Sequence, residues 1–262
     1  MSSTRNDARP QRPTISQVTG ELLVTFGVVL LLFAFYEAFW TNVEAGKLQD
    51  EAASDLNDKW DRTNPRQHHR PELGEAFAQM YIPTFGSDYA FAIIEGTNED
   101  SLLAGPGHYE ETQMPAEPGN FAVAGHRVGK GAPFNDLGQL ESCDAIVVET
   151  ATQWVTYRVL PMGTDPAARE GEASDCLSPD QVQRVAGGDY SHVMGRHITL
   201  PGDVSVLEPL PGASNAENPE PVITLTTCHP QFSNAERMIV HAMQTEVQDK
   251  SAGTPSAFEE VA

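Results

Sequence analysis

An apolar segment lies near the N-terminus of this 262-residue chain. It begins at Leu22, carries no charge before Glu37, and closes with Phe39 and Trp40. Its length of about 19 residues approaches the roughly 20 that a membrane-spanning helix needs. A buried core helix would show a polar face, and a cleaved signal peptide would end in small residues rather than in aromatic ones. We therefore predict an uncleaved transmembrane signal anchor over residues 21–41.

Charges on either side of the anchor predict its orientation. Three arginines precede it, at positions 5, 9 and 12, whereas residues 44–61 have an acidic excess. The positive-inside rule then leaves residues 1–20 as a cytoplasmic tail and places the rest of the chain outside the cell. The predicted location is the cell membrane, crossed once, with the N-terminus in the cytoplasm.

Residues 42–72 are predicted to form an extracellular stalk and linker. Residues 49–60 have helical composition, whereas residues 61–73 are rich in Pro, His, Arg and Asn. His68 and His69 are adjacent in this linker, and neighbouring histidines in an irregular, cation-rich segment make a poor chelate. No metal site is predicted.

From residue 73 onward, short apolar runs alternate with Gly, Pro and Asn. Period-two alternation is clearest from Trp154 to Val159, and several such runs indicate an all-β barrel or sandwich over residues 73–245. Residues 246–262 are predicted to be a polar C-terminal tail. The expected strands are Phe77–Ile82, Ala90–Glu95, Asn120–His126, Ala145–Thr150, Gln153–Pro161, Pro221–Cys228 and Arg237–Met243, and the expected short helices are Phe134–Leu140 and Ser178–Val185.

Charge and cysteine content narrow the function. A net charge of −21 opposes binding to nucleic acid, which requires a basic surface. The three cysteines are Cys143, Cys176 and Cys228. Outside the cell an odd count leaves at least one thiol unpaired, so either one pair forms a disulfide or all three are free.

Cys228 ends a short β-rich run that reads TLTTC and is the candidate nucleophile. A reactive thiol needs a base or a cation beside it. His126 ends the apolar run FAVAGH where a loop begins, whereas the rival base His229 adjoins Cys228 and would point to the opposite face of a strand. Arg237 opens the next strand, where an antiparallel pair would set it beside Cys228, although a surface salt bridge is the alternative role for this arginine.

These motifs together resemble the sortases, the membrane-anchored cysteine transpeptidases of Gram-positive bacteria. The resemblance rests on TLTTC, on Arg237 nine positions later, and on Gly125-His126 followed by PFxxLxxL. The stretches GPGHY, PGNFAVAGHR and TTCHPQFSNAERMIVHA are similar to class E sortases of actinobacteria in particular. The likeness extends over roughly residues 20–242.

The resemblance implies an eight-stranded sortase-type β-barrel with short helices and an activity without a cofactor. Cys228 would attack the Thr–Gly bond of an LAxTG- or LPxTG-type sorting signal on a surface protein, giving a thioacyl enzyme. An amine, usually from a peptidoglycan precursor, would release the product. His126 would be the general acid and base, and Arg237 would hold the substrate and the oxyanion.

Further residues receive roles from the same resemblance. Tyr109 in GPGHY matches a tyrosine implicated in the preference of class E enzymes for alanine in the signal. Thr226 and Thr227 would border the nucleophile in the substrate site, although β propensity alone would explain them. The sequence departs from the family at Cys143 and Cys176, which are candidates for a disulfide.

Two alternatives remain open at this point. A pilin-polymerising sortase would use a lysine as the acceptor, and no residue separates it from a cell-wall enzyme. A catalytically inactive, membrane-tethered binding module would lack a histidine, cysteine or arginine of the site, and all three are present. An L,D-transpeptidase would carry a SHGC-like motif, which this chain lacks.

Overall fold

The computed structural model describes residues 14–62, 70–213 and 217–260. The chain divides into two compact units, Met1–Thr41 and Asn42–Ala262. The predictions for most of residues 1–20 and for the pair His68 and His69 fall outside the described residues.

The first unit contains an apolar helix, α1 (Ile15–Phe35), followed by a π-helical turn, η1 (Tyr36–Trp40). A capping box starts α1: Thr14 accepts a hydrogen bond from the backbone of Gln17, whose side chain accepts one from the Thr14 backbone at 3.0 Å. The helix has a mean hydropathy of 2.2 and no buried residue, so its length and composition suit a membrane span. It begins earlier than the predicted residue 21 because the cap lies at Thr14.

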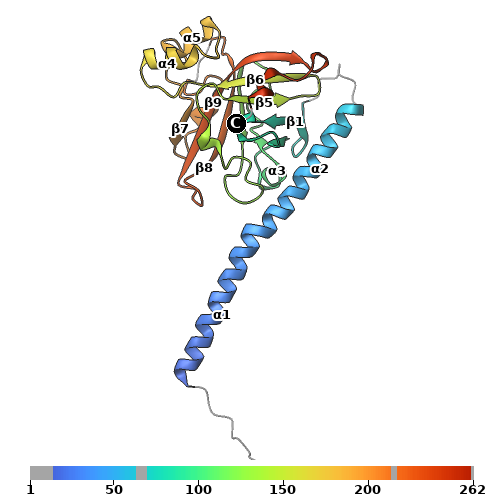
Figure 1. The fold of residues 1–262 in the computed structure, drawn as a ribbon, viewed down its shortest axis with the longest axis vertical. Helices are drawn as coiled ribbons and strands as arrows, with labels where there is room; N and C mark the ends of the chain where they lie inside the picture. The colour runs from blue at the N-terminus through green and yellow to red at the C-terminus, as the bar shows by residue number, and fades with distance from the viewer. Residues whose placement is uncertain (1–13, 63–69, 214–216, 261–262) are drawn as a thin grey trace, which may run out of the picture. The chain divides into compact units, whose positions relative to one another are not determined.

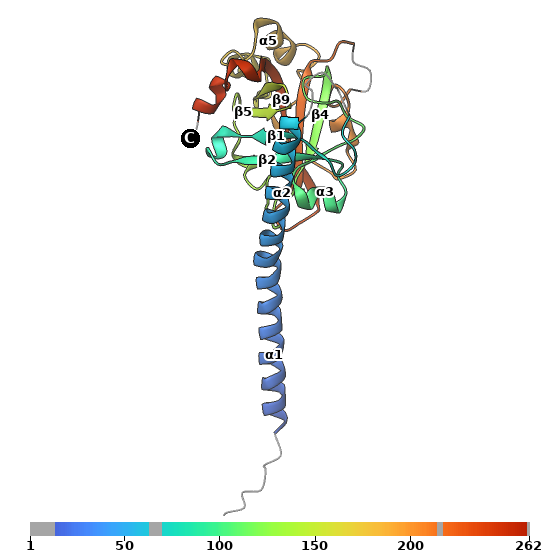
Figure 2. The same ribbon diagram turned by 90° about the vertical axis from the view of Figure 1, so that its right-hand side faces the viewer.

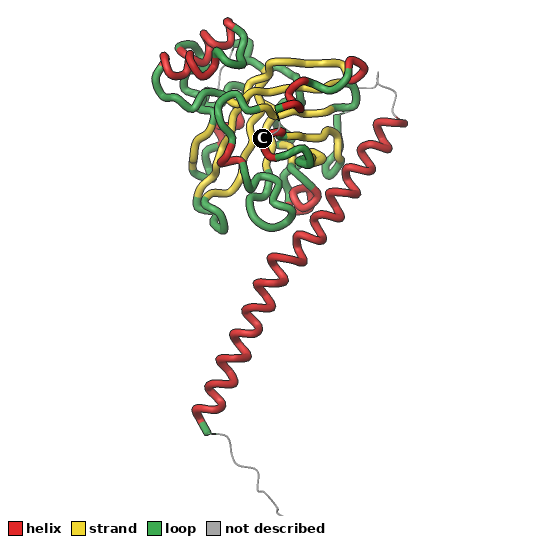
Figure 3. Tube along the Cα trace, in the orientation of Figure 1, coloured by secondary structure: helices red, strands yellow, loops and turns green. Residues whose placement is uncertain are grey.

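The second unit is built on a closed β-barrel (Figures 1 and 3). Eight strands pair in the order β6-β5-β1-β2-β3-β4-β8-β9, and β9 pairs again with β6 to close the ring, while β7 joins β9 outside it. The predicted eight-stranded barrel is confirmed. The strands are β1 (Ala76–Tyr81), β2 (Ala90–Glu95), β3 (Gly107–His108), β4 (Gly119–Ala124), β5 (Ala145–Glu149), β6 (Gln153–Val159), β7 (Arg196–Thr199), β8 (Pro221–His229) and β9 (Glu236–Asp249).

Apolar side chains from nearly every strand of the ring meet inside the barrel. Burying each large aliphatic or aromatic side chain contributes about 1.5–3 kcal/mol relative to leaving it exposed. This packed interior gives the strand ends at the barrel rim fixed positions. The core includes Met80, Ile93, Phe121, Val123, Ile146, Val148, Val155, Tyr157, Ile223, Leu225 and Val240.

β9 closes the barrel because it is long enough to serve several neighbours. It pairs with β8 from Glu236 to Met243, and its other edge pairs with β7 from Arg237 to Val240 and with β6 from Ala242 onward. The strand therefore continues past Thr245, where the predicted domain ends. Polar residues such as Gln244 and Glu246 obscure the strand pattern there.

Part of the predicted polar tail also belongs to the folded unit. The turns η5 (Lys250–Ala252) and η6 (Ser256–Glu259) follow β9, and Ala257 is buried in a cluster with Trp154. Lys250 pairs with Glu149 at 2.6 Å. Phe258 packs against the same cluster, but two adjacent apolar residues carry no periodic signal, which explains the difference.

The segment predicted as a stalk forms a longer helix, α2 (Thr41–Arg62), which packs against the barrel (Figure 2). Leu56 is buried in a cluster with Ala92 and Ile94 of β2. Near the start of α2, the backbone N–H of Gly131 donates to Asn42 at 3.2 Å. The helix is therefore attached to the barrel along much of its length.

Two helices, α4 (Pro166–Ala173) and α5 (Pro179–Ala186), lie together at one end of the barrel (Figures 1 and 2). Cys143, just before β5, forms a disulfide with Cys176, between the two helices. Arg169 of α4 is buried and donates to the carbonyl oxygens of Val185 and Val193 at 2.7 and 2.8 Å. The α5 prediction is confirmed, and of the two cysteine alternatives the disulfide is the one found.

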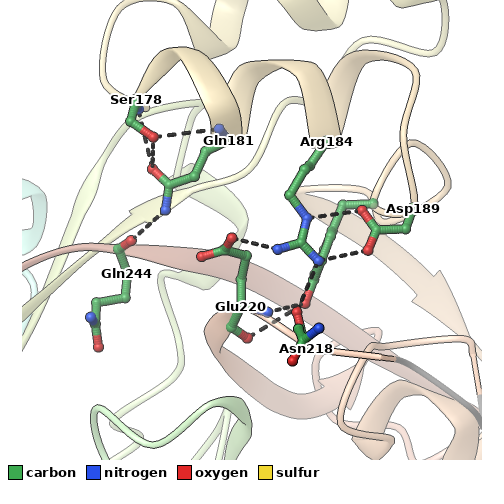
Figure 4. A network of polar contacts seen from close by, with 8 residues as sticks. Ser178, Gln181, Arg184, Asp189, Asn218, Glu220 and Gln244 are labelled. Atoms are coloured by element: carbon green, nitrogen blue, oxygen red, sulfur yellow. Dashed lines mark hydrogen bonds and ion pairs between the residues drawn. The ribbon is translucent and has the colours of Figure 1, made fainter.

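Polar contacts attach α5 to the barrel (Figure 4). Gln181, which completes a capping box at the start of α5, also donates to the Gln244 carbonyl oxygen of β9 at 2.8 Å. Arg184 pairs with Asp189 at 2.6 Å and with Glu220, directly before β8, at 2.5 Å. These contacts lie at the start of β8, and Cys228 lies near its other end.

Several short elements were not predicted from the sequence, because three to six residues carry little periodicity. The predicted helix Phe134–Leu140 is only a single 3₁₀ turn. The remaining elements are α3 (Glu99–Ala104), η2 (Pro83–Phe85), η3 (Leu137–Gln139) and η4 (Val204–Leu207).

Candidate active site

The strand order brings His126, Cys228 and Arg237 to one rim of the barrel. β4 and β8 run parallel with Ala124 opposite Thr226, so the chain leaves both strands at the same edge. β8 and β9 are antiparallel with Cys228 directly opposite Arg237. The antiparallel placement predicted for the cysteine and the arginine is what the register gives.

Cys228 is the free cysteine of the described chain and is partly exposed. Its thiol donates a hydrogen bond to Oδ1 of Asn234 at 2.9 Å. In this contact the sulfur is the donor and the amide oxygen is the acceptor. Asn234 lies in the loop between β8 and β9. Sequence periodicity does not predict that this loop folds back onto the cysteine.

His126 is positioned by a tight approach of the following loop. The backbone N–H of Phe134 donates to the His126 carbonyl oxygen at 3.0 Å. A Cβ atom on Gly125 would lie 2.5 Å from the Phe134 ring, so glycine permits this contact. The sequence motif Gly-His followed by Pro-Phe therefore corresponds to residues that pack against one another in the structure.

The imidazole of His126 is half-buried, and its Nε2 has no hydrogen-bond partner among the described residues. Burial, and secondarily the positive charge of Lys130, lowers its pKa, which Glu99 opposes. This direction favours the neutral ring, which can accept a proton. A neutral imidazole at the same rim as a thiol can serve as its base.

Arg237 offers its guanidinium to the same rim. Its Nη1 donates to the backbone oxygens of Glu236 at 3.0 Å and Asn234 at 3.4 Å. Within the described ranges no carboxylate forms an ion pair with it, so the alternative role as a salt-bridge arginine finds no partner there. A guanidinium without a carboxylate partner can donate hydrogen bonds to a carbonyl oxygen or an oxyanion.

Tyr109, Thr226 and Thr227 lie against this site but differ in what they contact. The Tyr109 hydroxyl shares a hydrogen bond with the Thr226 hydroxyl at 3.0 Å. Thr227 is buried and donates to the Gly125 carbonyl oxygen at 2.7 Å, just before His126. Thr227 thus ties the histidine strand to the cysteine strand and has a structural contact of its own.

His229 and Arg127 form a pair behind the nucleophile. Nη1 of Arg127 donates to Nδ1 of His229 at 2.6 Å and to the Cys228 carbonyl oxygen at 3.4 Å. The His229 ring is engaged by Arg127, as expected for a residue that points away from Cys228. Arg127 was not singled out from the sequence, although its position directly after His126 was a usable signal.

Tyr109 is supported from below by a buried polar network. His108 of β3 is fully buried and contacts Glu95 at 2.7 Å. Its other ring nitrogen lies 3.0 Å from the hydroxyl of Thr112, which in turn donates to the Tyr109 carbonyl oxygen at 2.8 Å. Satisfied buried networks of this kind rigidify their surroundings.

Among the described residues no group of three or more potential metal ligands gathers.

Comparison with known proteins places this arrangement in a family. Residues 80–245 match the sortase domain family. The chain is 35% identical to sortase SrtE1 of Streptomyces coelicolor, over 97% of this chain and 65% of SrtE1, so it spans less than two thirds of that relative. It is 29% identical to SrtE2 of the same organism, over 90% of this chain and 85% of SrtE2.

Solved structures agree. SrtF sortase from Corynebacterium diphtheriae is 60% identical with a TM-score of 0.73, covering 76% of this chain and 99% of that one. Sortase E from Streptomyces avermitilis is 33% identical with a TM-score of 0.54, covering 72% and 99%. The chain therefore belongs to the sortase family, and its similarity to the Streptomyces SrtE proteins confirms the class E resemblance of its motifs.

Proposed function

We propose that this chain is a membrane-anchored cysteine transpeptidase that transfers surface proteins to an amine of the cell wall. The observation that carries the proposal is the register between β8 and β9, which sets Cys228 opposite Arg237 at the rim that His126 also reaches. A thiol, a neutral base and a guanidinium without a carboxylate partner are the groups that acyl transfer requires.

The first half-reaction forms a thioacyl enzyme. The sulfur of Cys228 attacks the threonine carbonyl carbon of an LAxTG- or LPxTG-type signal, and its proton moves to His126. Arg237 stabilises the oxygen that becomes negative. When the Thr–Gly bond breaks, the protonated His126 returns the proton to the departing glycine amine.

The second half-reaction reverses these roles. An amine nitrogen attacks the thioester carbon and gives up a proton to His126. The carbon–sulfur bond then breaks, and the proton returns to the sulfur, so that a new amide and the free thiol are left. The lowered pKa of His126 suits this cycle because a neutral imidazole can serve as the base at both attacks.

Tyr109 and Thr226 are proposed to contact the signal, and the hydrogen bond between them supports a shared role at the position of alanine or proline. Sortase E1 from Streptomyces coelicolor has been solved with a tripeptide in the active site. That occupied site supports a peptide substrate here.

The apolar helix α1 is proposed to anchor the protein, with the N-terminus in the cytoplasm and the barrel outside the cell. Its length and hydropathy support the span. The disulfide between Cys143 and Cys176 supports the external location, because such bonds persist in oxidising compartments.

The test is a cleavage and transfer assay with the full chain in detergent micelles. Fluorogenic LAxTG and LPxTG peptides are supplied with either a glycine-terminated amine or a lysine side-chain amine, and the transfer products are identified by mass. Cleavage with transfer to the glycine amine supports the proposal, and transfer to lysine alone would favour a fibre polymerase. Failure to cleave either peptide would refute the proposed substrate class.

A further inference from the structure

Asn234 contacts both the nucleophile and the residue opposite it. Its side-chain Oδ1 lies 2.9 Å from the sulfur of Cys228, and its backbone oxygen lies 3.4 Å from Nη1 of Arg237. Among the described residues, Asn234 is the one whose side chain forms a hydrogen bond with the Cys228 sulfur. The Asn234 side chain is exposed.

The loop that carries Asn234 is held by local turns. The backbone N–H of Ser233 donates to the Pro230 carbonyl oxygen at 3.1 Å, and that of Ala235 donates to the Ser233 hydroxyl at 3.2 Å. These two bonds fix the backbone on both sides of Asn234. A structured turn therefore positions the side-chain amide of Asn234 next to the sulfur.

We infer that Asn234 is a further catalytic residue, whose side-chain amide holds the sulfur of Cys228 as a thiol at rest and as a thiolate after its proton has left. The inference rests on the proposed function. It adds a residue to the three that the sequence motifs single out.

The role of Asn234 in the resting enzyme follows from its contact with the Cys228 sulfur. A carbonyl oxygen accepts hydrogen bonds and cannot donate one, so the contact between Oδ1 and the sulfur requires S–H. The neutral imidazole favoured by the lowered pKa of His126 agrees with a protonated thiol. The amide thus orients the thiol without ionising it.

The role of Asn234 after proton transfer follows from the two ends of its amide, which are alike in shape but are an acceptor and a donor. When the proton passes from Cys228 to His126, a half-turn of the Asn234 amide replaces Oδ1 by Nδ2 at the sulfur. Nδ2 carries two N–H donors, and a hydrogen bond to a charged acceptor is about twice as strong as a neutral one. Because S–H is a weak donor, the amide stabilises the thiolate more than the thiol.

A purely structural role for Asn234 predicts something different. In that case the backbone oxygen facing Arg237 would matter, and any side chain that preserves the turn would serve. An aspartate in place of Asn234 keeps the shape and the acceptor but loses the donor and adds a negative charge. The reactivity of the sulfur in this variant therefore distinguishes the catalytic role from the structural one.

The experiment measures alkylation of the full chain by iodoacetamide in detergent micelles without reductant, followed by intact mass. Cys143 and Cys176 are joined in the disulfide, so Cys228 is the thiol that reacts. At pH 7 we expect Asn234→Ala to slow alkylation about tenfold and Asn234→Asp to slow it further. Both losses should become smaller as the pH is raised, because at high pH a thiolate forms even without the amide.

Gln231→Ala is the matched control, because this amide in the same loop contacts Asn135 at 2.8 Å rather than the sulfur. It should alkylate at the wild-type rate. Rates within twofold of wild type in both Asn234 variants would overturn the inference, as would a loss in Asn234→Ala that Asn234→Asp does not share. Asn234→Asp, which matches asparagine in shape, keeps the test valid if the alanine variant unfolds.

Peptide turnover gives the second readout. If the wild-type chain cleaves a sorting-signal peptide, Asn234→Ala should lower kcat about tenfold and change KM less than twofold, because the amide contacts the nucleophile. A KM effect alone would overturn the catalytic role. Alkylation needs no peptide, so the role of Asn234 at the sulfur is tested even if the proposed substrate class is wrong.

Discussion

Cys228 of β8 lies directly opposite Arg237 of β9 in an antiparallel pair. Residues paired in this way have Cβ atoms about 4.5–5.5 Å apart and project from the same face of the sheet. The long arginine side chain can therefore cover the carbon that the sulfur attacks. This register explains why the cysteine and the arginine are separated by one hairpin in sequence.

Arg237→Ala should lower kcat about 100- to 1000-fold, which is the usual cost of removing one oxyanion donor. Arg237→Lys should recover only part of this, because an ammonium cannot reproduce the planar fork of donors. Peptide cleavage at saturating substrate is the measurement. Arg62→Ala removes an exposed arginine that pairs with Asp58 and should leave the rate unchanged. Full activity in Arg237→Ala would remove Arg237 from the mechanism.

Gly125→Ala should disturb His126 without touching its ring. The added Cβ would lie 2.5 Å from the Phe134 ring, and overpacking of this kind costs about 1–3 kcal/mol. We expect a lower denaturation midpoint together with a large loss of turnover. Gly171→Ala is the control, because nothing lies within 4 Å of its Cβ on α4, and helix propensity should make it neutral or slightly stabilising. Wild-type turnover in Gly125→Ala would contradict the packing argument.

Loss of the disulfide should destabilise the fold. Cys143 and Cys176 are 33 positions apart, and closing a loop of that size lowers the entropy of the unfolded chain by the equivalent of about 3–4 kcal/mol. The double variant Cys143→Ser/Cys176→Ser should show this loss in urea unfolding and should still alkylate at Cys228. In the wild type, reduction should raise the intact mass by about two daltons, the two hydrogens added when one such bond is opened. An unchanged mass would show that the bond does not form.

Acid should destabilise the barrel through its buried histidines. Burial, and then the charges of His197 and His192, lower the pKa of His241 to about 3, while burial also lowers the pKa values of His126 and His197. Below about pH 6.5 the unfolded chain binds protons that the folded chain does not, so stability falls as the pH falls.

For one such histidine the expected slope between pH 6 and pH 5 is about 1.4 kcal/mol per pH unit. His241→Gln should be less stable at pH 7, since it loses the contact with Thr224 at 2.8 Å, but should lose less on going from pH 7 to pH 5. Urea unfolding at several pH values measures both effects. An equal acid slope in wild type and variant would show that His241 does not titrate on unfolding.

Much of the fold was predictable because its strands are buried on one or both sides. Period two from Trp154 to Val159 and the apolar runs of β4 and β8 predicted strands that the structure confirms. β3, with two residues, and the later part of β9, with polar side chains, have no such pattern. The packing of α2 on β2 rests on few apolar residues of the helix, chiefly Leu56 and Trp60, and so its docking was missed.

The site was predictable where chemistry restricts the residue type. His126, Cys228 and Arg237 stood at strand ends, and the strand register brings those ends together. Asn234 could not be predicted, because an asparagine in a loop is usually a turn residue. Only the turn that folds back onto Cys228 reveals its contact with the sulfur.

The mass of the enzyme during turnover tests the thioacyl mechanism at its nucleophile. The full chain is mixed with an LAxTG peptide in the absence of amine, quenched with acid and measured intact. The mechanism predicts an added mass equal to the peptide fragment that ends at threonine, released by hydroxylamine and absent in Cys228→Ala. Cleavage that persists in Cys228→Ala, or an adduct that forms without Cys228, would contradict it.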